Sequence, residues 1–317
     1  MIAPPVIAIG ASAGGIEALR RLLHALPADL AAAVVVVVHM DARQPSLLPG
    51  VLSTSGPLPA TEAIDGEPLV AGRVLTAAPG RHLLIERDSV RLLDGPRENL
   101  HRPSIDVLFR SLASSHGARG IGVVLSGALD DGTAGLISLK RAGGLAAVQD
   151  PADAVFPDMP SSALRYVTAD ATGTAESLAG DLVRLVERAA AAPAPDPEMG
   201  GTGTPVATIN CPDCDAALVE DRSLGLLAFR CPSGHRFTLT SMMAGHDDAL
   251  ERALWSAQRA LLESAALAAR VSLRARENGQ DDIASRFAAR AEQQRRHIAI
   301  IRSMIVAERQ ASPGRPD

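Results

Sequence analysis

The sequence contains very few aromatic residues. Only 2% of its 317 residues are Phe, Trp or Tyr, whereas 47% are hydrophobic. The interior must therefore be built from aliphatic side chains. A chain of this length can form one sizeable core plus something smaller.

An excess of charge and a long apolar run are also missing. The formal net charge of -5 provides no overall attraction to nucleic acid or to an anionic membrane, so we expect neither as a partner. The longest apolar run, 30–38, is far shorter than the roughly 20 residues that cross a bilayer, and we expect no membrane insertion. The N-terminus has no basic segment followed by an apolar stretch, so we expect a cytoplasmic protein.

Cysteine is scarce, and its spacing is informative. Three cysteines in a chain without an export signal argue against a disulfide framework. Cys211 and Cys214 form one pair, and Cys231 is followed four residues later by His235. Three thiolates and an imidazole form a closed tetrahedral site that suits zinc and leaves no position for a substrate. We therefore expect a structural zinc ion and no cofactor for catalysis; the alternative is three ordinary buried cysteines.

Apolar runs alternate with helical patterns through the first 188 residues. Such an alternation predicts an α/β fold with a doubly wound, mostly parallel sheet. The predicted strands are 6–9, 34–38, 74–77, 83–85, 121–125 and 146–148, and the predicted helices include 17–25, 104–115 and 132–142.

The remaining chain divides by composition. We predict a first domain over 1–188, a linker over 189–207 that is rich in Ala, Pro, Gly and Thr, a zinc-ribbon-like module over 208–242, an antiparallel helical hairpin over 243–310 and a tail over 311–317. Apolar residues at near-heptad spacing indicate the hairpin: Leu250, Leu254, Leu261, Ala265 and Val271, then Ile283, Phe287, Ala291, Ile298, Ile301 and Ile305. Its mixed charge favours packing on a partner protein or on a second copy over binding nucleic acid.

The first predicted strand runs into a turn with the sequence GASAGG. A dinucleotide-binding turn requires glycine where this chain has Ser12, so an oxidoreductase is the weakest hypothesis. The same residues fit G-x-S-x-G, in which small neighbours let a sharp turn expose a serine. A turn of this kind can also simply connect a strand to a helix, and its partners must decide.

Two other predicted strands end in suitable partners. His39 follows the valine run, and Asp130 and Asp131 follow the strand 121–125. The carboxyl ends of parallel strands lie at one edge of a sheet, so serine, imidazole and carboxylate are predicted to meet there. That set supports acyl transfer, in which the imidazole takes the serine proton and the carboxylate orients the imidazole. The Ala13 N–H and an amide near Ala128 are the expected oxyanion donors.

Eight short segments of the first domain resemble the catalytic domain of the CheB-type protein-glutamate methylesterases. In order, they read IGASAGGIEAL, VVHM, APGRHLLI, RPSIDVLF, GVVLSGALDDGTAG, AGG, QD and MPSSA. The resemblance implies hydrolysis of glutamyl methyl esters on the cytoplasmic helices of chemoreceptors, with release of methanol and, in some members, deamidation of glutamine. It also implies that Ser12, His39 and Asp131 form the catalytic triad.

The sequence departs from the family pattern near the nucleophile. Ala13 replaces the usual Thr or Ser, Asp41 replaces a Pro, and Ala128 and Leu129 stand where the family has Met and Gly. The family motif begins near residue 6, so we expect a catalytic domain without the receiver domain that chemotaxis members usually carry. These departures keep an alternative open: a non-catalytic or redirected scaffold that acts through its ribbon and helical hairpin.

Several other polar residues are assigned structural roles. Ser104 is predicted to cap the helix 104–115, whose start Arg102 and Asp106 also fix. The remaining histidines, His101 among them, are expected to be structural or on the surface, with His82 the likeliest exception.

Overall fold

The computed structural model describes residues 4–40, 46–192, 204–214, 217–221, 225–231 and 234–311. The chain forms two compact units, Met1–Met242 and Met243–Asp317. Among the described residues, no helix is both long enough and apolar enough to cross a membrane. Asp41 and most of the predicted linker lie outside the described residues.

A seven-stranded sheet forms the centre of the first unit, and all of its strand pairs are parallel. β1 and β2 are fully buried because helices cover both faces, which is why they read as uninterrupted apolar runs. In spatial order the strands are β3 (Ala60–Glu62), β4 (Val74–Thr76), β2 (Ala33–Val38), β1 (Val6–Ala11), β7 (Gly120–Val124), β8 (Leu145–Gln149) and β9 (Ala171–Gly173).

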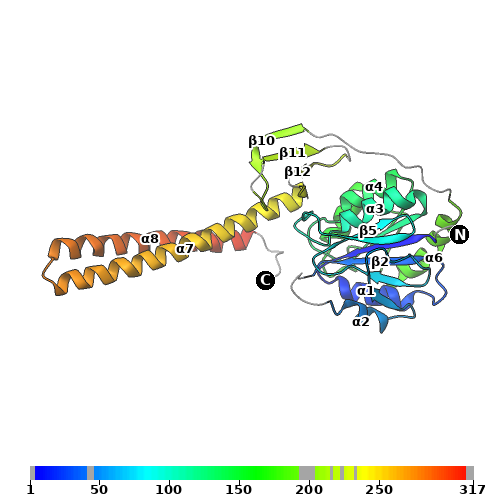
Figure 1. Ribbon diagram of the computed structural model, residues 1–317, viewed down its shortest axis with the longest axis horizontal. Coiled ribbons are helices and arrows are strands. Elements are labelled where there is room, and N and C mark those ends of the chain that lie inside the picture. The colour runs from blue at the N-terminus through cyan, green and yellow to red at the C-terminus, as the bar shows by residue number, and fades with distance from the viewer. Residues whose placement is uncertain are drawn as a thin grey trace. The chain divides into compact units, whose positions relative to one another are not determined.

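Two helical layers enclose this sheet, with α1 and α2 on one side and α3 and α4 on the other (Figure 1). Each layer packs on alternate residues of β1, so both faces of the strand are apolar. The predicted doubly wound α/β fold is therefore confirmed. The helices are α1 (Gly15–Ala25), α2 (Leu48–Ser53), α3 (Ile105–His116), the short 3-10 helix Gly117–Arg119, α4 (Thr133–Arg141), α5 (Asp158–Tyr166) and α6 (Ser177–Ala190).

The predicted strand 83–85 does not join the parallel sheet. It lies in β5 (His82–Glu86), which forms a separate antiparallel hairpin with β6 (Ser89–Leu93). The alternating burial of β6 explains the difference, because a strand with one solvated face suits an antiparallel ribbon that packs on one side only.

The strand order reverses direction at β1. The chain continues from β1 to β2 on one side of it and returns later to β7 on the other. Ligand sites in open α/β sheets lie outside the carboxyl ends of the strands at such a switch point. The segments that follow β1, β2 and β7 therefore converge there.

The ribbon is a four-stranded antiparallel sheet that belongs to the first unit. Its strands are β10 (Thr204–Asn210), β11 (Ala217–Asp221), β12 (Ala228–Arg230) and β13 (Arg236–Thr238). Among the described side chains of this module, the buried core consists of Cys211, Leu218, Phe229, Cys231, Phe237 and Met242. So few apolar side chains provide little folding free energy, and the module therefore needs a further source of stability.

The second unit contains most of α7 (Leu239–Glu277) and all of α8 (Asp281–Ala311), joined by a tight turn with Gly279 at φ 70°. Small buried residues, including Ala265, Ala268 and Ala291, let the helices approach closely. The hydrogen bond from Ser272 Oγ to Ala284 O (2.7 Å) joins the two helices.

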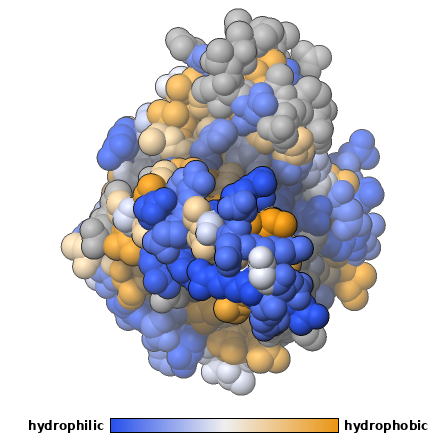
Figure 2. All heavy atoms as spheres, turned by 90° about the vertical axis from the view of Figure 1, so that its left-hand side faces the viewer, coloured by the Kyte–Doolittle hydropathy of each residue, from blue (hydrophilic) through white to orange (hydrophobic). Residues whose placement is uncertain are grey.

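Two of the apolar residues predicted to pack between the two helices are exposed. Leu250 is 42% exposed and Ile283 is 39% exposed. Figure 2 shows a face of the molecule on which hydrophilic residues predominate and apolar ones are scattered. Such isolated exposed apolar side chains are ordinary on a protein surface.

Candidate active site

Ser12 lies in the sharp turn between β1 and α1. Its N–H donates to Ser126 O (3.0 Å) and its carbonyl accepts from the Gly15 N–H (2.9 Å), so the backbone of the turn is fixed on both sides. Gly14 adopts φ 70° directly before the helix, a left-handed conformation that glycine accepts without strain. Ser12 is partly exposed, so a substrate could reach it.

The loop after β7 approaches Ser12 closely because it carries a glycine. A Cβ atom on Gly127 would lie 2.9 Å from Ser12 Cβ and 2.1 Å from Met159 Sδ. Any side chain at this position would push the loop away from the serine.

The three predicted residues form one hydrogen-bonded chain. His39 Nδ1 lies 3.0 Å from Ser12 Oγ, and His39 Nε2 lies 2.8 Å from Asp131 Oδ2. His39 comes directly after β2, and its own N–H donates to Ala11 O (3.3 Å), which anchors the residue beside the serine turn. The arrangement has the connectivity of a serine hydrolase triad.

The partners of the His39 ring determine its tautomer. An ionised carboxylate only accepts hydrogen bonds, so Nε2 carries the proton that faces Asp131. Nδ1 then presents a lone pair to the Ser12 hydroxyl. The ring nitrogens are interchanged relative to the template in which Nε2 faces the serine, but the functions are the same.

A second imidazole stacks on the first. The rings of His39 and His101 have centroids 3.5 Å apart and an interplanar angle of 11°. Burial, together with the neighbouring His39, lowers the pKa of His101 to about 3. His101 therefore stays neutral near pH 7. Its stacking fixes the orientation of the His39 ring without adding a competing positive charge.

Asp131 accepts hydrogen bonds from the start of α3 as well as from His39. The N–H groups of Ile105 (2.7 Å) and Asp106 (3.2 Å) donate to it, as does Ser104 Oγ (3.0 Å). Asp131 thus caps this helix from a distant part of the chain. The prediction that Ser104 is the N-cap is right for its position, but its hydroxyl donates to Asp131 instead of accepting from the helix.

The charge state of Asp131 follows from these contacts. Burial raises its pKa, but the hydrogen bond and charge of His39, with help from His101 and Asn99, outweigh that effect and hold the pKa well below its usual range. Asp106 has the opposite balance, since burial and the nearby Asp131 raise its pKa to about 8. The site therefore holds one carboxylate ionised beside one that stays protonated at neutral pH.

Two contributors to the site were not predicted from the sequence. Asn99 Nδ2 donates to Asp131 Oδ1 (2.8 Å), and His101 stacks on His39. Both residues lie in a loop without hydrophobic periodicity, and the only available signal was their position just before the family-like RPSID segment. His82, the predicted exception, lies beneath α3, where it contacts the Ser104 N–H and Pro96 O.

The sequence model of the CheB methylesterase family matches residues 7–182. The chain belongs to the CheB methylesterase family. A protein-glutamate methylesterase/protein-glutamine glutaminase 2 of Rhodospirillum rubrum is 40% identical over 187 residues, 58% of this chain and 51% of that protein. A protein of the same name from Xanthomonas oryzae pv. oryzae is 39% identical over 188 residues, 58% of this chain and 52% of that protein.

A solved structure also resembles this chain. The crystal structure of the Thermotoga maritima CheB methylesterase catalytic domain matches with a TM-score of 0.55 and 29% sequence identity. The match covers 58% of this chain and all of that one. The chain spans about half the length of the curated relatives that it matches.

The loop after β7, beside Ser12, differs from the family pattern. Within the described part of the chain, neither the Ala13 N–H nor the Ala128 N–H has a hydrogen-bond partner inside the protein. Leu129, which stands where the family has glycine, adopts φ 64°. A leucine in this left-handed region is strained by roughly 1–2 kcal/mol.

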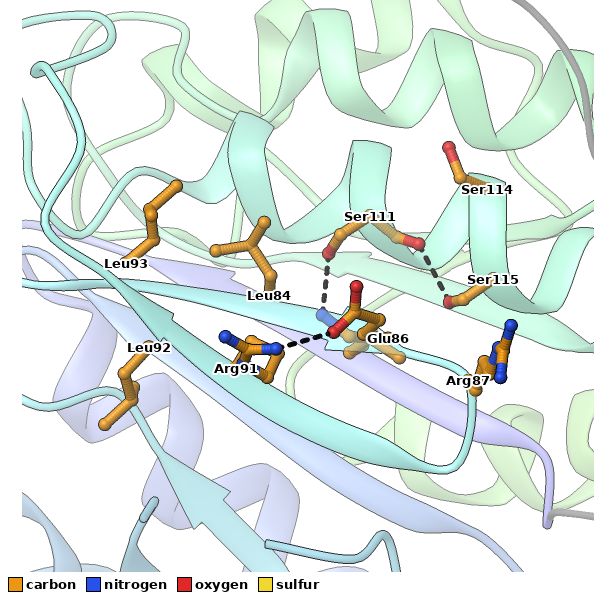
Figure 3. Close-up of a pocket in the computed structure, with 10 residues that line it drawn as sticks. Leu84, Glu86, Arg87, Arg91, Leu92, Leu93, Ser111, Ser114 and Ser115 are labelled. Carbon is orange, nitrogen blue, oxygen red and sulfur yellow. Dashed lines mark hydrogen bonds and ion pairs between the residues drawn. The ribbon is translucent and has the colours of Figure 1, made fainter. Parts of the chain in front are cut away.

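One pocket in the described part of the chain lies away from these residues. It has a volume of about 560 Å³ and lies between the β5–β6 hairpin and α3 (Figure 3). Its wall includes the Arg91–Glu86 ion pair (3.1 Å) and Ser111, whose Oγ accepts the Ile85 N–H (2.9 Å). Because none of the triad residues lines it, we assign this pocket no part in the chemistry.

The four predicted metal ligands converge. The ligand atoms of Cys211, Cys214, Cys231 and His235 all lie within 4.8 Å of one another. Three of the pairs are 3.4, 3.6 and 3.7 Å apart. Zinc–sulfur and zinc–nitrogen bonds of about 2.3 and 2.1 Å in a tetrahedron place neighbouring ligands about 3.5–3.8 Å apart, so the donor set fits zinc. The second ring nitrogen of His235 faces Asp213 (3.8 Å), the kind of outer partner that orients a ligating imidazole.

Proposed function

We propose that this chain is a serine hydrolase that demethylates glutamyl methyl esters on chemoreceptor-like proteins and releases methanol. The observation that carries the proposal is the chain of hydrogen bonds from Ser12 through His39 to Asp131. The substrates in view are the methylated cytoplasmic helices of such receptors, and the chain would act in the cytoplasm. The names of the relatives support both ester hydrolysis and glutamine deamidation.

In the first step, Ser12 Oγ attacks the ester carbonyl carbon while His39 Nδ1 takes the hydroxyl proton. The carbonyl oxygen becomes negative, and the N–H groups of Ala13 and Ala128 are proposed to stabilise it. Asp131 stabilises the imidazolium that forms, because its carboxylate stays ionised.

In the second step, the tetrahedral intermediate collapses. The bond to the methoxy group breaks, His39 returns the proton to it, and methanol leaves. A water molecule then attacks the acyl-enzyme, giving up a proton to His39, which passes it back to Ser12 Oγ as the glutamate carboxylate is released. With a glutamine side chain the leaving group is ammonia, and the other steps are unchanged.

We also propose that zinc occupies the cluster of three cysteines and His235. With four protein ligands it would have no open position, so its contribution is to folding.

The test of the esterase proposal is methanol release from methylated receptor fragments. We expect release by the wild type and a loss of at least about 10³-fold in Ser12→Ala, because removal of the nucleophile leaves only residual stabilisation. Ser114→Ala, an exposed serine on α3, is the matched control and should retain the wild-type rate. Equal rates in the wild type and in Ser12→Ala would refute the proposal.

A fluorophosphonate probe separates this proposal from the scaffold alternative. Labelling requires a serine that is activated by an adjacent base. We expect one label per chain, at Ser12. A chain that folds and binds zinc but remains unlabelled would act instead as a non-catalytic scaffold.

A further inference from the structure

The Asn99 side chain lies between the triad carboxylate and the ribbon. Its Nδ2 donates to Asp131 Oδ1 (2.8 Å) and to Asp106 Oδ2 (2.7 Å). Its Oδ1 accepts from the Thr238 N–H (3.0 Å) and from Ser241 Oγ (2.9 Å). The Thr238 amide only donates, so the orientation of the Asn99 amide is fixed, and every donor and acceptor of this buried side chain is used.

A second contact joins the same two parts of the chain. Thr238 Oγ1 donates to Asp130 Oδ1 (2.8 Å), the neighbour of the triad aspartate. The Asn99 N–H also donates to Arg236 O (2.8 Å). The polar side chains in this contact are at most 6% exposed, so water does not replace their hydrogen bonds easily.

The ribbon side of this contact lies next to the metal ligands. Thr238 ends β13, only three residues after His235. The His235 carbonyl accepts from the Cys231 N–H (3.0 Å), so the turn between β12 and β13 is closed by two of the metal ligands. With its small core, the module depends on the metal to hold this turn, and therefore to hold Thr238 at Asn99.

From these contacts we infer that Asn99 is a positioning residue that couples the metal-bound ribbon to Asp131. The inference rests on the proposed esterase function and concerns the control of that site. The metal would contact no reacting atom. It would act through the ribbon and Asn99 on the position of Asp131, and so on how well Asp131 orients His39. When the ribbon loosens, Asn99 loses two of its four partners, and the carboxylate loses one fixed donor while keeping those of α3.

The expected effect is a partial loss of reactivity. Loss of one hydrogen bond to a buried charged group is expected to lower the rate by about 10- to 100-fold, if the bond is fully expressed in the transition state.

The test combines one substitution with zinc removal in the full-length chain. We would measure the rate of fluorophosphonate labelling of Ser12 in the wild type and in Asn99→Ala, each with zinc and after chelation. We expect a loss of about 10- to 100-fold from the substitution, a similar loss from chelation of the wild type, and less than about threefold further loss from chelation of the variant. Chelation that leaves the wild type unchanged, or that slows both proteins by the same factor, would overturn the inference.

A second readout does not depend on serine reactivity. The NMR signal of the His39 Nε2 proton reports its hydrogen bond to Asp131. We expect the signal to shift in Asn99→Ala and in the chelated wild type, together with the apparent pKa of the labelling rate. If the zinc-loaded wild type is not labelled at all, the esterase proposal fails, but the His39 signal still decides whether the ribbon is coupled to the triad.

A milder substitution tests the same contact in case Asn99→Ala does not fold. Ser241→Ala removes one donor to Asn99 Oδ1 and leaves every triad contact in place. We expect a loss of about 3- to 10-fold in labelling rate, with a shift of the His39 signal in the same direction as that of Asn99→Ala. Asn278→Ala, in the turn between α7 and α8, is the matched control and should match the wild type. If Ser241→Ala were labelled as fast as Asn278→Ala and showed the same His39 signal, coupling through the ribbon would be rejected.

Discussion

At the scale of single residues, burial and hydrogen bonding together decide which carboxyl and imidazole groups are charged. Asp131 and Asp106 are both buried and both contact Asn99, but the hydrogen bond from His39 keeps only Asp131 ionised. The ionised carboxylate is the one that is hydrogen-bonded to the His39 ring. The same rule applies away from the site, where burial lowers the pKa of His116 to about 4.

The lowered pKa of the buried His116 predicts that stability depends on pH. The unfolded chain binds a proton at this side chain below about pH 6.5, whereas the folded chain does not until about pH 4. Acid therefore favours the unfolded state across this window, by up to about 1.4 kcal/mol per pH unit. Between pH 7 and pH 5 the free energy of unfolding should therefore fall in the wild type by up to about 2 kcal/mol more than in His116→Leu. Urea unfolding of both proteins at the two pH values measures the difference. An identical pH dependence in both proteins would contradict the assigned cause.

At the scale of elements, loops determine how the site is assembled. The strands bring Ser12, His39 and Asp131 to one edge, but the loop after β7 sets how closely they meet. That loop combines a glycine with no room for a side chain, Gly127, with a strained residue, Leu129. Its conformation is therefore held by its surroundings and not by its own preferences.

Substitutions at Leu129 test this strain. A β-branched residue fits φ 64° poorly, so Leu129→Val should lower the free energy of unfolding by about 1 kcal/mol. Leu129→Gly relieves the strain but adds freedom to the unfolded chain, so we expect it to stay within about 1 kcal/mol of the wild type. Thermal unfolding of the two variants measures the difference. If valine were tolerated better than glycine, backbone strain would not be the dominant factor at this position.

At the scale of the whole molecule, the chain contains cores of very different size. The parallel sheet is enclosed by two large aliphatic clusters, whereas the described side chains of the ribbon form a small one. Stability is therefore expected to be uneven, with the ribbon depending on the proposed metal and the sheet on apolar burial.

Zinc removal should expose this difference. After chelation, we expect the amides of β12 and β13 to lose protection against hydrogen exchange, while those of β1 and β2 keep theirs. Hydrogen-exchange mass spectrometry with and without chelator measures both regions in one sample. Protection that is unchanged in the ribbon would mean that the module folds without metal.

From residue patterns alone one could predict the central strands of the parallel sheet, the serine and imidazole at its edge with a carboxylate at 130 or 131, and the four side chains whose ligand atoms converge in the ribbon. The family resemblance selected Asp131 from the two carboxylates. These features are carried by local patterns: apolar runs, a Gly-Ser turn, residues that end strands and paired cysteines. Three contacts could be seen only in the folded chain: Asp131 caps α3, His101 stacks on His39, and Asn99 joins the ribbon to the triad. Those contacts join loops far apart in the chain, and a loop without periodicity carries no local signal of its neighbours.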